Sequence, residues 1–311
     1  MIIEYFICIF AIVMQKEGLR SSILFAHVVA FVTVAIWGTT FVSTKVLINN
    51  SLTPAQIFLF RFILAYLSIW IISPKRLFSD NIRDELIFLA LGVTGGSLYF
   101  MTENEALCHS TATNVSLIVC ICPLLTTLLL GLFYHSERLS KVQWLGSLIA
   151  CSGMALVVLN GHFVLHLSPW GDTLAFCAAL CWAFYSLLIK RVSASYPSVF
   201  ITRKVFFYGL ITIIPYFIFV PSMPSLHLLM DIPVLVNLLF LGFVASMLCF
   251  LTWNWCITRL GAVHATNYIY FNPLMTIIAA QIVLNERITL YIIAGTALII
   301  VGMYLAERMR R

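Results

Sequence analysis

Ten apolar segments joined by short polar connections constrain the fold of this chain more than any other feature. Each is roughly 16 to 25 residues long, enough for a helix to cross a hydrocarbon core about 30 Å thick. Hydrophobic residues make up 62% of the sequence and charged residues 10%, whereas soluble domains are about half apolar. We therefore expect an all-α integral membrane protein with ten transmembrane helices. In order, the segments cover residues 23–47, 54–72, 86–107, 113–133, 142–159, 171–189, 199–220, 234–257, 262–284 and 289–306.

The connections between the segments are too short to hold a soluble domain. This argues against catalysis on a large water-borne substrate, and we expect no enzyme. The first fourteen residues are apolar but too short to span a bilayer, and they carry Glu4 rather than the basic residues of a signal peptide. We interpret residues 1–22 as an N-terminal extension at the membrane interface. The alternative is that Met14 is the true start.

Basic residues gather on alternate connections. With the amino terminus inside the cell, fifteen Lys and Arg residues fall on inner connections and flanks, and only Arg287 falls outside. This predicts a multi-pass protein of the cell inner (plasma) membrane with both termini cytoplasmic and a basic tail over residues 307–311. It also accounts for the net charge of +6, so no nucleic-acid partner is expected. The fifteen are Lys16, Arg20, Lys75, Arg76, Arg83, Arg138, Lys141, Lys190, Arg191, Arg203, Lys204, Arg259, Arg308, Arg310 and Arg311.

Cysteine and histidine form no recognisable ligand set. Most of the nine cysteines lie inside apolar segments, and only Cys108 approaches the predicted outer surface. A disulfide framework is therefore not expected. The seven histidines are scattered, and none has a suitably spaced cysteine or carboxylate partner. We expect neither a metal site nor another cofactor.

The second half of the sequence repeats the first. "LGVTGGSLYFMTENEAL" from Leu91 and "LGFVASMLCFLTWNWCI" from Leu241 share six residues at a constant offset of 150, and Pro123 and Pro273 continue the match. Each repeat holds five apolar segments, and an odd number turns the second copy upside down. We therefore expect two inverted five-helix repeats, residues 23–160 and 169–306, related by a pseudo-twofold axis in the membrane plane.

Four stretches carry a family resemblance: "AIWGTTFVSTK", "RFILAYL", "EALCHSTATNVSLIVCICPLLTTLLLGLFYHSERLSKVQWLGSLIACSGMAL" and its echo "PLMTIIAAQIVLNERITLYIIAGTALIIVGM". They resemble the EamA-type transporters of the drug/metabolite transporter superfamily, over nearly all residues from Ala35 to Ala306. The resemblance implies a ten-helix secondary transporter whose repeats enclose a central cavity, with the fifth and tenth helices at the periphery. It also implies export or exchange of small metabolites, without naming one.

Glu103 and Glu105 stand at the outer end of a strongly apolar segment. A charge at a helix centre costs about 2.5 to 3.5 kcal/mol, so such residues usually face a cavity or a partner. Lys45 and Arg61 lie in the same outer half and supply that partner. The two glutamates are about 200° apart around the helix. Because Glu103 lies one turn from Tyr99, we place Glu103 at the pore and expect Glu105 to pair with Lys45 or reach the outer headgroups.

Two interpretations of these charges stay open. Either the cations and glutamates form an ion-paired lock that closes an outer gate, or they bind substrate and protons. In both, a guanidinium as deep as Arg61 is expected to need a carboxylate. The second repeat carries the matching cations without acids, so we expect intramembrane acids in the outer half alone: Lys190 and Lys204 correspond to Lys45 and Arg61, while Trp253 and Trp255 replace the glutamates.

Aromatic residues, prolines and glycines complete the pattern. Trp and Tyr can line an apolar cavity, but they also gather at membrane interfaces. Pro123 and Pro273 lie in the middle of predicted helices, where proline favours a kink. The kinks either bend during transport or are static. Glycines at helical spacing in the fifth and tenth segments predict close helix packing.

Together these features predict a secondary transporter that exports a small, amino-acid-like metabolite across the plasma membrane by alternating access, with the proton as candidate coupling ion and the lipid bilayer as its surroundings. The alternatives are a non-transporting partner subunit and a passive channel. Interior polarity argues against a mere anchor. The predicted gating or coupling residues are Glu103, Glu105, Pro123 and Pro273. The predicted substrate-binding residues are Trp37, Lys45, Arg61, Tyr99, Glu103, Asn104, Trp182, Tyr185, Asn254 and Tyr270.

Overall fold

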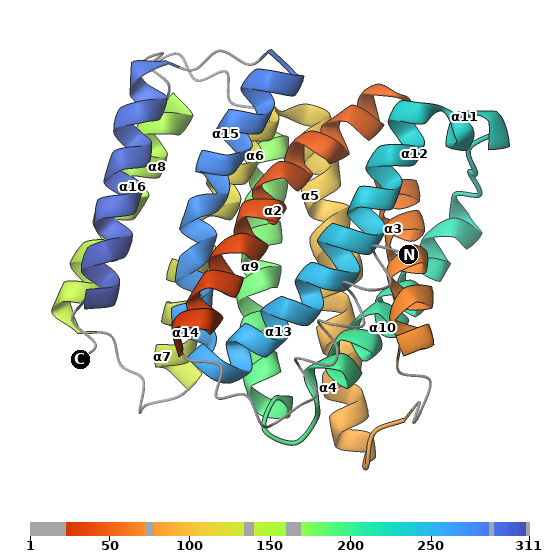
Figure 1. The fold of residues 1–311 in the computed structure, drawn as a ribbon, viewed down its shortest axis with the longest axis horizontal. Helices are drawn as coiled ribbons and strands as arrows, with labels where there is room; N and C mark the ends of the chain where they lie inside the picture. The colour runs from red at the N-terminus through yellow and green to blue at the C-terminus, as the bar shows by residue number, and fades with distance from the viewer. Residues whose placement is uncertain (1–22, 73–77, 134–139, 160–168, 286–288, 309–311) are drawn as a thin grey trace.

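The computed structural model describes residues 23–72, 78–133, 140–159, 169–285 and 289–308, and every regular element in these ranges is helical. The helices run up and down between the two ends of one bundle (Figure 1). The N-terminal extension and the last three residues of the basic tail lie outside the described ranges. So do several of the basic residues used for the orientation: Lys16, Arg20, Lys75, Arg76, Arg138 and Arg287.

The bundle has two ends, which we name after residues near them. The Lys45 end is where α2 (Ile23–Asn49) finishes and α3 (Pro54–Ile72) begins, and the Glu85 end is where α4 (Ile82–Gly92) begins. The remaining elements are η1 (Val93–Ser97), α5 (Leu98–His109), α6 (Ala112–Val119), α7 (Cys122–Phe133), α8 (Lys141–Leu159), α9 (Pro169–Val192), α10 (Ser198–Phe219), α11 (Leu226–Met230), α12 (Ile232–Leu239), η3 (Phe240–Leu248), α13 (Cys249–Leu260), α14 (Ala262–Asn267), η4 (Tyr268–Phe271), α15 (Asn272–Val283) and α16 (Leu290–Arg308).

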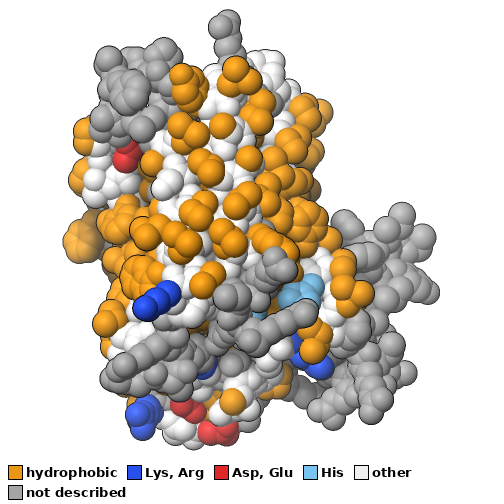
Figure 2. All heavy atoms as spheres, turned by 90° about the vertical axis from the view of Figure 1, so that its left-hand side faces the viewer, with side chains coloured by type: hydrophobic (Ala, Val, Ile, Leu, Met, Phe, Trp, Pro, Cys, Tyr) orange, Lys and Arg blue, Asp and Glu red, His pale blue; other side chains and the backbone are white. Residues whose placement is uncertain are grey.

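Seven continuous helical stretches among the described residues are long and apolar enough to cross a membrane, and a shorter apolar stretch covers Leu290–Gly302. Large apolar side chains cover the middle of the face that carries α8 and α16 (Figure 2), where Leu148 and Ile293 are exposed. Such a surface suits lipid rather than water. The chain is an all-helical, multi-pass membrane protein. The seven stretches are Ile23–Asn49, Pro54–Ile72, Ile82–His109, Ala112–Phe133, Pro169–Val192, Ser198–Phe219 and Ile232–Leu260.

Pro123 and Pro273 lie inside longer helical stretches, as predicted, and each lies at a break where a new helical segment begins. Pro123 is the second residue of α7, which begins after α6 has ended at Val119. Pro273 is the second residue of α15, which follows the 3-10 turn η4. Proline is tolerated in the first helical turn because the N–H that it lacks has no intrahelical partner there. Each proline therefore opens the second half of a broken helix.

A π-helical turn, η1, interrupts the stretch that runs from α4 into α5. Inside it Gly96 has non-helical backbone angles of φ −126° and ψ −107°. A Cβ on the neighbouring Gly95 would lie 2.2 Å from the Tyr185 ring of α9, so the helices approach too closely here for any other residue. The second π-helical segment, η3, lies between α12 and α13 and includes the positions 150 residues after those of η1. Both irregularities occur near the middle of the bundle.

The helices α8 and α16 pack against each other at one side of the bundle (Figure 1). A Cβ on Gly153 would lie 2.5 Å from the Gly295 carbonyl oxygen, and one on Gly302 would lie 2.5 Å from the Gly146 carbonyl oxygen. Small residues thus bring the two backbones into contact. The predicted close packing of these two segments is confirmed.

Candidate functional site

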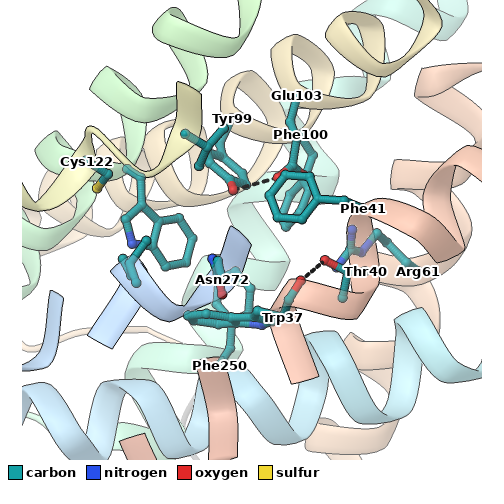
Figure 3. A pocket seen from close by; sticks show the side chains of 13 residues that line it. Trp37, Thr40, Phe41, Arg61, Tyr99, Phe100, Glu103, Cys122, Phe250 and Asn272 are labelled. Atoms are coloured by element: carbon teal, nitrogen blue, oxygen red, sulfur yellow. Dashed lines mark hydrogen bonds between the residues drawn. The ribbon is translucent and has the colours of Figure 1, made fainter. Parts of the chain in front are cut away.

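A small cavity lies at the centre of the bundle, where α2, α3, α5, α9 and α13 meet α6, α7, η4 and α15 (Figure 3). Its volume of ≈ 30 Å³ gives room for about two water molecules. The wall is aromatic with a few polar groups. Its residues are Trp37, Thr40, Phe41, Arg61, Tyr99, Phe100, Glu103, Val119, Cys122, Trp182, Phe250, Ile269 and Asn272.

Glu103 is the acid of this cavity, and its side chain is only 4% exposed. The hydroxyl of Tyr99, one helical turn earlier on α5, donates a 2.7 Å hydrogen bond to the Glu103 carboxylate (Figure 3). Residues four apart share one helix face. The predicted placement of Tyr99 and Glu103 together at the cavity is confirmed.

Arg61 is the cation of the cavity and is 1% exposed. Its Nε donates a 3.0 Å hydrogen bond to Ser246 Oγ, and its Cζ lies 4.1 Å from the centre of the Phe100 ring. Its Nη1 has no hydrogen-bond partner among the described residues.

No direct ion pair joins Arg61 to a carboxylate within the described ranges, and the expectation that this guanidinium needs a carboxylate stays a prediction, with Glu103 of the same cavity as the candidate. A hydroxyl and an aromatic face satisfy part of the guanidinium instead, which is a known way to hold arginine away from water. Arg61 and Glu103 nevertheless line the same cavity, where opposite charges attract across a medium of low dielectric constant.

The aromatic wall is built mainly from two tryptophans. The rings of Trp37 and Trp182 meet edge to face with centroids 5.1 Å apart, and Trp182 lies 5.0 Å from Tyr99. Trp37 is fixed by a 2.9 Å hydrogen bond from Nε1 to the Ala245 carbonyl, whereas Trp182 Nε1 is buried without a partner in the described chain. Both predicted tryptophans therefore line the cavity rather than a membrane interface.

Tyr185 and Asn254, both predicted to bind substrate, lie behind this wall. The Tyr185 hydroxyl donates to Asn254 Oδ1 at 2.8 Å, and Asn254 Nδ2 donates to Thr202 Oγ1 at 2.8 Å. All three side chains are buried and outside the cavity lining. They connect α9, α13 and α10, so their position favours a structural role.

Four further predicted residues also lie away from the cavity. Asn104 Nδ2 donates to the Pro54 carbonyl at 3.1 Å, and Tyr270 is buried but does not line the cavity.

Lys45 Nζ donates to the Leu107 and Ser110 carbonyls at the end of α5. Glu105 lies 3.2 Å from the ring of His109 and is partly exposed.

Of the two alternatives expected for Glu105, the pair with Lys45 does not form, and the partly exposed position of Glu105 suits the other, an approach to the outer headgroups. Lys45 reaches backbone carbonyls that the end of helix α5 leaves without intrahelical partners. With Arg61 also free of a direct carboxylate partner, no ion-paired lock of the predicted kind forms among these residues.

Several cavity residues were not predicted. Asn272 contributes a buried Oδ1 that no described group hydrogen-bonds. It directly precedes Pro273, so a search for polar residues beside the predicted break would have found it. Thr40 and Phe41 follow Trp37 at three and four positions, a spacing that returns to one helix face. Phe250 carried no signal beyond its hydrophobicity.

A second charged cluster, the Glu85 cluster, lies at the Glu85 end. Lys204 of α10 contacts the Glu85 carboxylate, which also accepts hydrogen bonds from the Tyr208 hydroxyl and from the Ser79 backbone N–H at 2.9 Å. The Lys204 side chain is 0% exposed. Glu85 is thus an acid paired with a cation at the end of the bundle opposite Glu103, whereas the expectation of intramembrane acids in the outer half alone stays a prediction. Glu85 comes from the first turn of α4 and has no counterpart among the repeated residues, which is why the comparison of repeats missed it.

Comparison with known proteins gives a consistent result. The model of the EamA-like transporter family matches residues 24–159 and 169–307. An "uncharacterized transporter" of Archaeoglobus fulgidus is 25% identical over 283 residues, covering 90% of this chain and 96% of that protein. A solved crystal structure shares the fold with a TM-score of 0.67 at 19% identity, covering 92% of this chain and 98% of that one.

Two relatives carry more specific names. A "probable amino-acid metabolite efflux pump" of Escherichia coli is 26% identical and covers 89% of this chain and 93% of its own length. A "probable terminal-alkyne amino-acid exporter" of Streptantibioticus cattleyicolor is 27% identical and covers 73% of this chain and 74% of its own. Since the family model matches both halves of the sequence, the chain belongs to the EamA-like transporter family and is a transporter, not an enzyme.

Proposed function

We propose that this protein is a secondary transporter that exports an amino-acid-like metabolite across the cell inner membrane by alternating access. The observation that carries the proposal is the central cavity, where Arg61 and Glu103 place opposite charges in one aromatic-walled space. Buried charges are costly in a membrane and usually serve a transported ligand. The relatives named for amino-acid export support the same substrate class.

The proposed substrate is a zwitterion. Its carboxylate would accept hydrogen bonds from Nη1 of Arg61, which has no partner in the described chain. Its ammonium group would lie between the Glu103 carboxylate and the buried Oδ1 of Asn272. Charge-assisted bonds of this kind are stronger than neutral ones. An apolar substrate side chain would pack on Trp37 and Trp182.

The cavity must widen to admit such a molecule, because ≈ 30 Å³ is far less than an amino acid needs. In alternating access this widening occurs towards one side of the membrane at a time. The broken helices that begin again at Pro123 and Pro273 border the cavity through Cys122 and Asn272. They are the proposed places where the wall moves.

We also propose that ten helices cross the membrane as two inverted repeats, residues 23–160 and 169–306. The residues shared at an offset of 150 support this, as do the π-helical segments η1 and η3 at matching positions. The excess of Lys and Arg on alternate connections supports an orientation with the Glu85 end and both termini in the cytoplasm.

The proton is the proposed coupling ion, with Glu103 as its carrier. Arg61 can compensate the charge of Glu103 or that of a substrate carboxylate, but not both fully. Substrate binding would therefore alter how readily Glu103 holds a proton, and by reciprocity protonation would alter substrate affinity equally. This linkage is what a proton antiporter requires.

Counterflow in proteoliposomes tests the proposed function. Vesicles containing the purified protein are loaded with an unlabelled amino acid, and uptake of the same labelled amino acid is measured across a panel. A carrier shows faster uptake into loaded vesicles, whereas a passive channel shows no such stimulation. A non-transporting subunit shows no uptake above that of protein-free vesicles, and either of these results would overturn the proposal.

A further inference from the structure

The Glu85 cluster ties the first turn of α4 to the second half of the chain. The Glu85 carboxylate contacts Lys204 and Tyr208 of α10. Asp84, the preceding residue, accepts a 2.7 Å hydrogen bond from the Tyr196 hydroxyl, between α9 and α10. These contacts bridge residues more than 100 positions apart in the sequence. Side-chain contacts thus join α4 to α10 and to the segment before it at the Glu85 end.

The Lys204–Glu85 pair is the strongest of these ties. The ammonium group is fully buried and lies within 6 Å of several aromatic rings, the nearest being Tyr208 at 4.9 Å and Phe78 at 5.3 Å. A charged partner offsets much of the cost of burying an ammonium group, and removing only that partner is strongly unfavourable. Glu85 also accepts bonds from Ser79 and Tyr208, which hold the carboxylate in place.

The two charged clusters of the transporter differ in whether the cation and the acid touch each other. In the cavity Arg61 and Glu103 are not in contact, and Arg61 donates to Ser246 instead. At the Glu85 end the cation and the acid are in direct contact. Lys204 is also the residue that corresponds to Arg61 in the second repeat. The structure therefore pairs the cation and the acid directly at the Glu85 end, and it leaves the two charges of the cavity without a direct ion pair.

Between the Glu85 cluster and the cavity lies the π-helical turn η1. Gly96 departs from helical geometry within it, so α4 and α5 are joined at an irregular turn of the kind that often marks a hinge. On one side of η1, α4 carries Glu85. On the other side, α5 carries Tyr99 and Glu103 of the cavity. A rotation at Val93–Ser97 can move Glu85 away from Lys204 while Glu103 stays in place.

We propose that the Glu85–Lys204 pair is the latch of the gate at the Glu85 end. The cavity opens to that side only when this pair separates and α4 pivots about η1. The inference goes beyond the transported substrate, since it concerns the gate and holds for any metabolite carried. Its test likewise needs no substrate.

Cys122 supplies a reporter inside the molecule. Its side chain lines the cavity and is fully buried. A variant retaining Cys122 as its sole cysteine is incubated with a membrane-impermeant charged methanethiosulfonate, added either to right-side-out or to inside-out vesicles. The rate of Cys122 modification from each side then measures how often the cavity opens to that side.

Glu85→Gln removes the charge and keeps the size. From the side of the Glu85 end, we expect modification of Cys122 at least about tenfold faster than in the parent, because a hydrogen bond to a charged group commonly contributes that much or more. From the other side the rate should fall or stay the same. The control is Asp231→Asn, which changes an exposed carboxylate before α12 and should alter neither rate.

Glu85→Gln takes the Glu85 charge away from the buried Lys204, so loss of this variant from the membrane would not by itself bear on the gate. The double variant Glu85→Gln with Lys204→Met removes both charges and avoids this problem. It should show the same acceleration from the same side. A rate equal to that of the parent, in whichever of the two variants reaches the membrane, would overturn the latch.

Discussion

The hydroxyl of Tyr99 and the carboxylate of Glu103 are joined by a 2.7 Å hydrogen bond across one turn of α5, inside the cavity. The bond orients the carboxylate towards the space that Arg61 also faces. Glu103 is therefore held ready for a ligand without being neutralised by a directly bonded cation. The first prediction concerns this arrangement.

Glu103→Gln should abolish transport driven by a pH gradient and preserve exchange of substrate at equal pH on both sides. Glutamine has the size of glutamate and can still accept the Tyr99 hydrogen bond, but it cannot carry a proton. The measurement is uptake into proteoliposomes with and without an imposed gradient. Glu105→Gln, on the exposed side of α5 beside His109, is the matched control and should have the milder effect. A Glu103→Gln variant that responds to the gradient like the parent would remove Glu103 from the coupling.

Arg61→Ala should abolish transport while the protein still reaches the membrane. The substitution removes the Nη1 donor from the cavity along with the bond to Ser246. Arg61→Lys should restore the charge but not the planar pair of donors, so it should transport with a raised KM. The control is Arg191→Ala, an exposed arginine at the end of α9. Near-normal transport by Arg61→Ala would show that the guanidinium plays no part in substrate binding.

Tyr185→Phe should destabilise the protein by about 1 to 3 kcal/mol, the usual cost of leaving a buried polar group without its partner. The lost group is the hydroxyl that donates to Asn254 Oδ1. Because Tyr185 lies behind the cavity wall, the substrate preference of the variant should match that of the parent. Thermal unfolding in detergent and a counterflow panel measure the two effects. A changed substrate preference with unchanged stability would place Tyr185 in the binding site after all.

Single cysteines at Ser140 and Asp231, in a cysteine-free protein, should be labelled from opposite sides of the membrane. Ser140 precedes α8 at the Glu85 end, and Asp231 precedes α12 at the Lys45 end; both residues are exposed. The charge distribution predicts Ser140 in the cytoplasm and Asp231 outside. Impermeant maleimides applied to intact cells and to inverted vesicles give the answer. Labelling of both positions from one side would rule out the proposed topology.

Segment lengths made most of the fold predictable. The predicted span 54–72 coincides with α3, and the predicted span 23–47 ends two residues before α2 does. Apolar length sets where a chain can cross a membrane, so such boundaries follow from the sequence. Breaks inside a span did not follow, because the same apolar residues suit α-helix, π-helix and 3-10 turn alike. Only Pro123 and Pro273 hinted at breaks, and they begin half-helices rather than bend whole ones.

The candidate site was predictable where residues share one helix. Tyr99 with Glu103 follows from a spacing of four, and Trp37 lies on the same cavity wall as expected. Pairings between helices were not predictable, since depth in the membrane does not fix rotation about the helix axis. Similar depth in the membrane suggested that Lys45 pairs with Glu105. In the structure Lys45 donates to the Leu107 carbonyl, and Glu105 lies beside His109. Glu85 was missed because its partner, Lys204, lies 119 positions away on another helix.

The size of the central cavity has a consequence for the cell's energy supply. A space of ≈ 30 Å³ between packed aromatic rings is too small for a continuous file of water molecules. In the described part of the chain, this cavity therefore offers protons and small ions no wet route from one end of the bundle to the other. A cell can keep many copies of such a transporter in its membrane without short-circuiting the electrochemical gradient on which it depends.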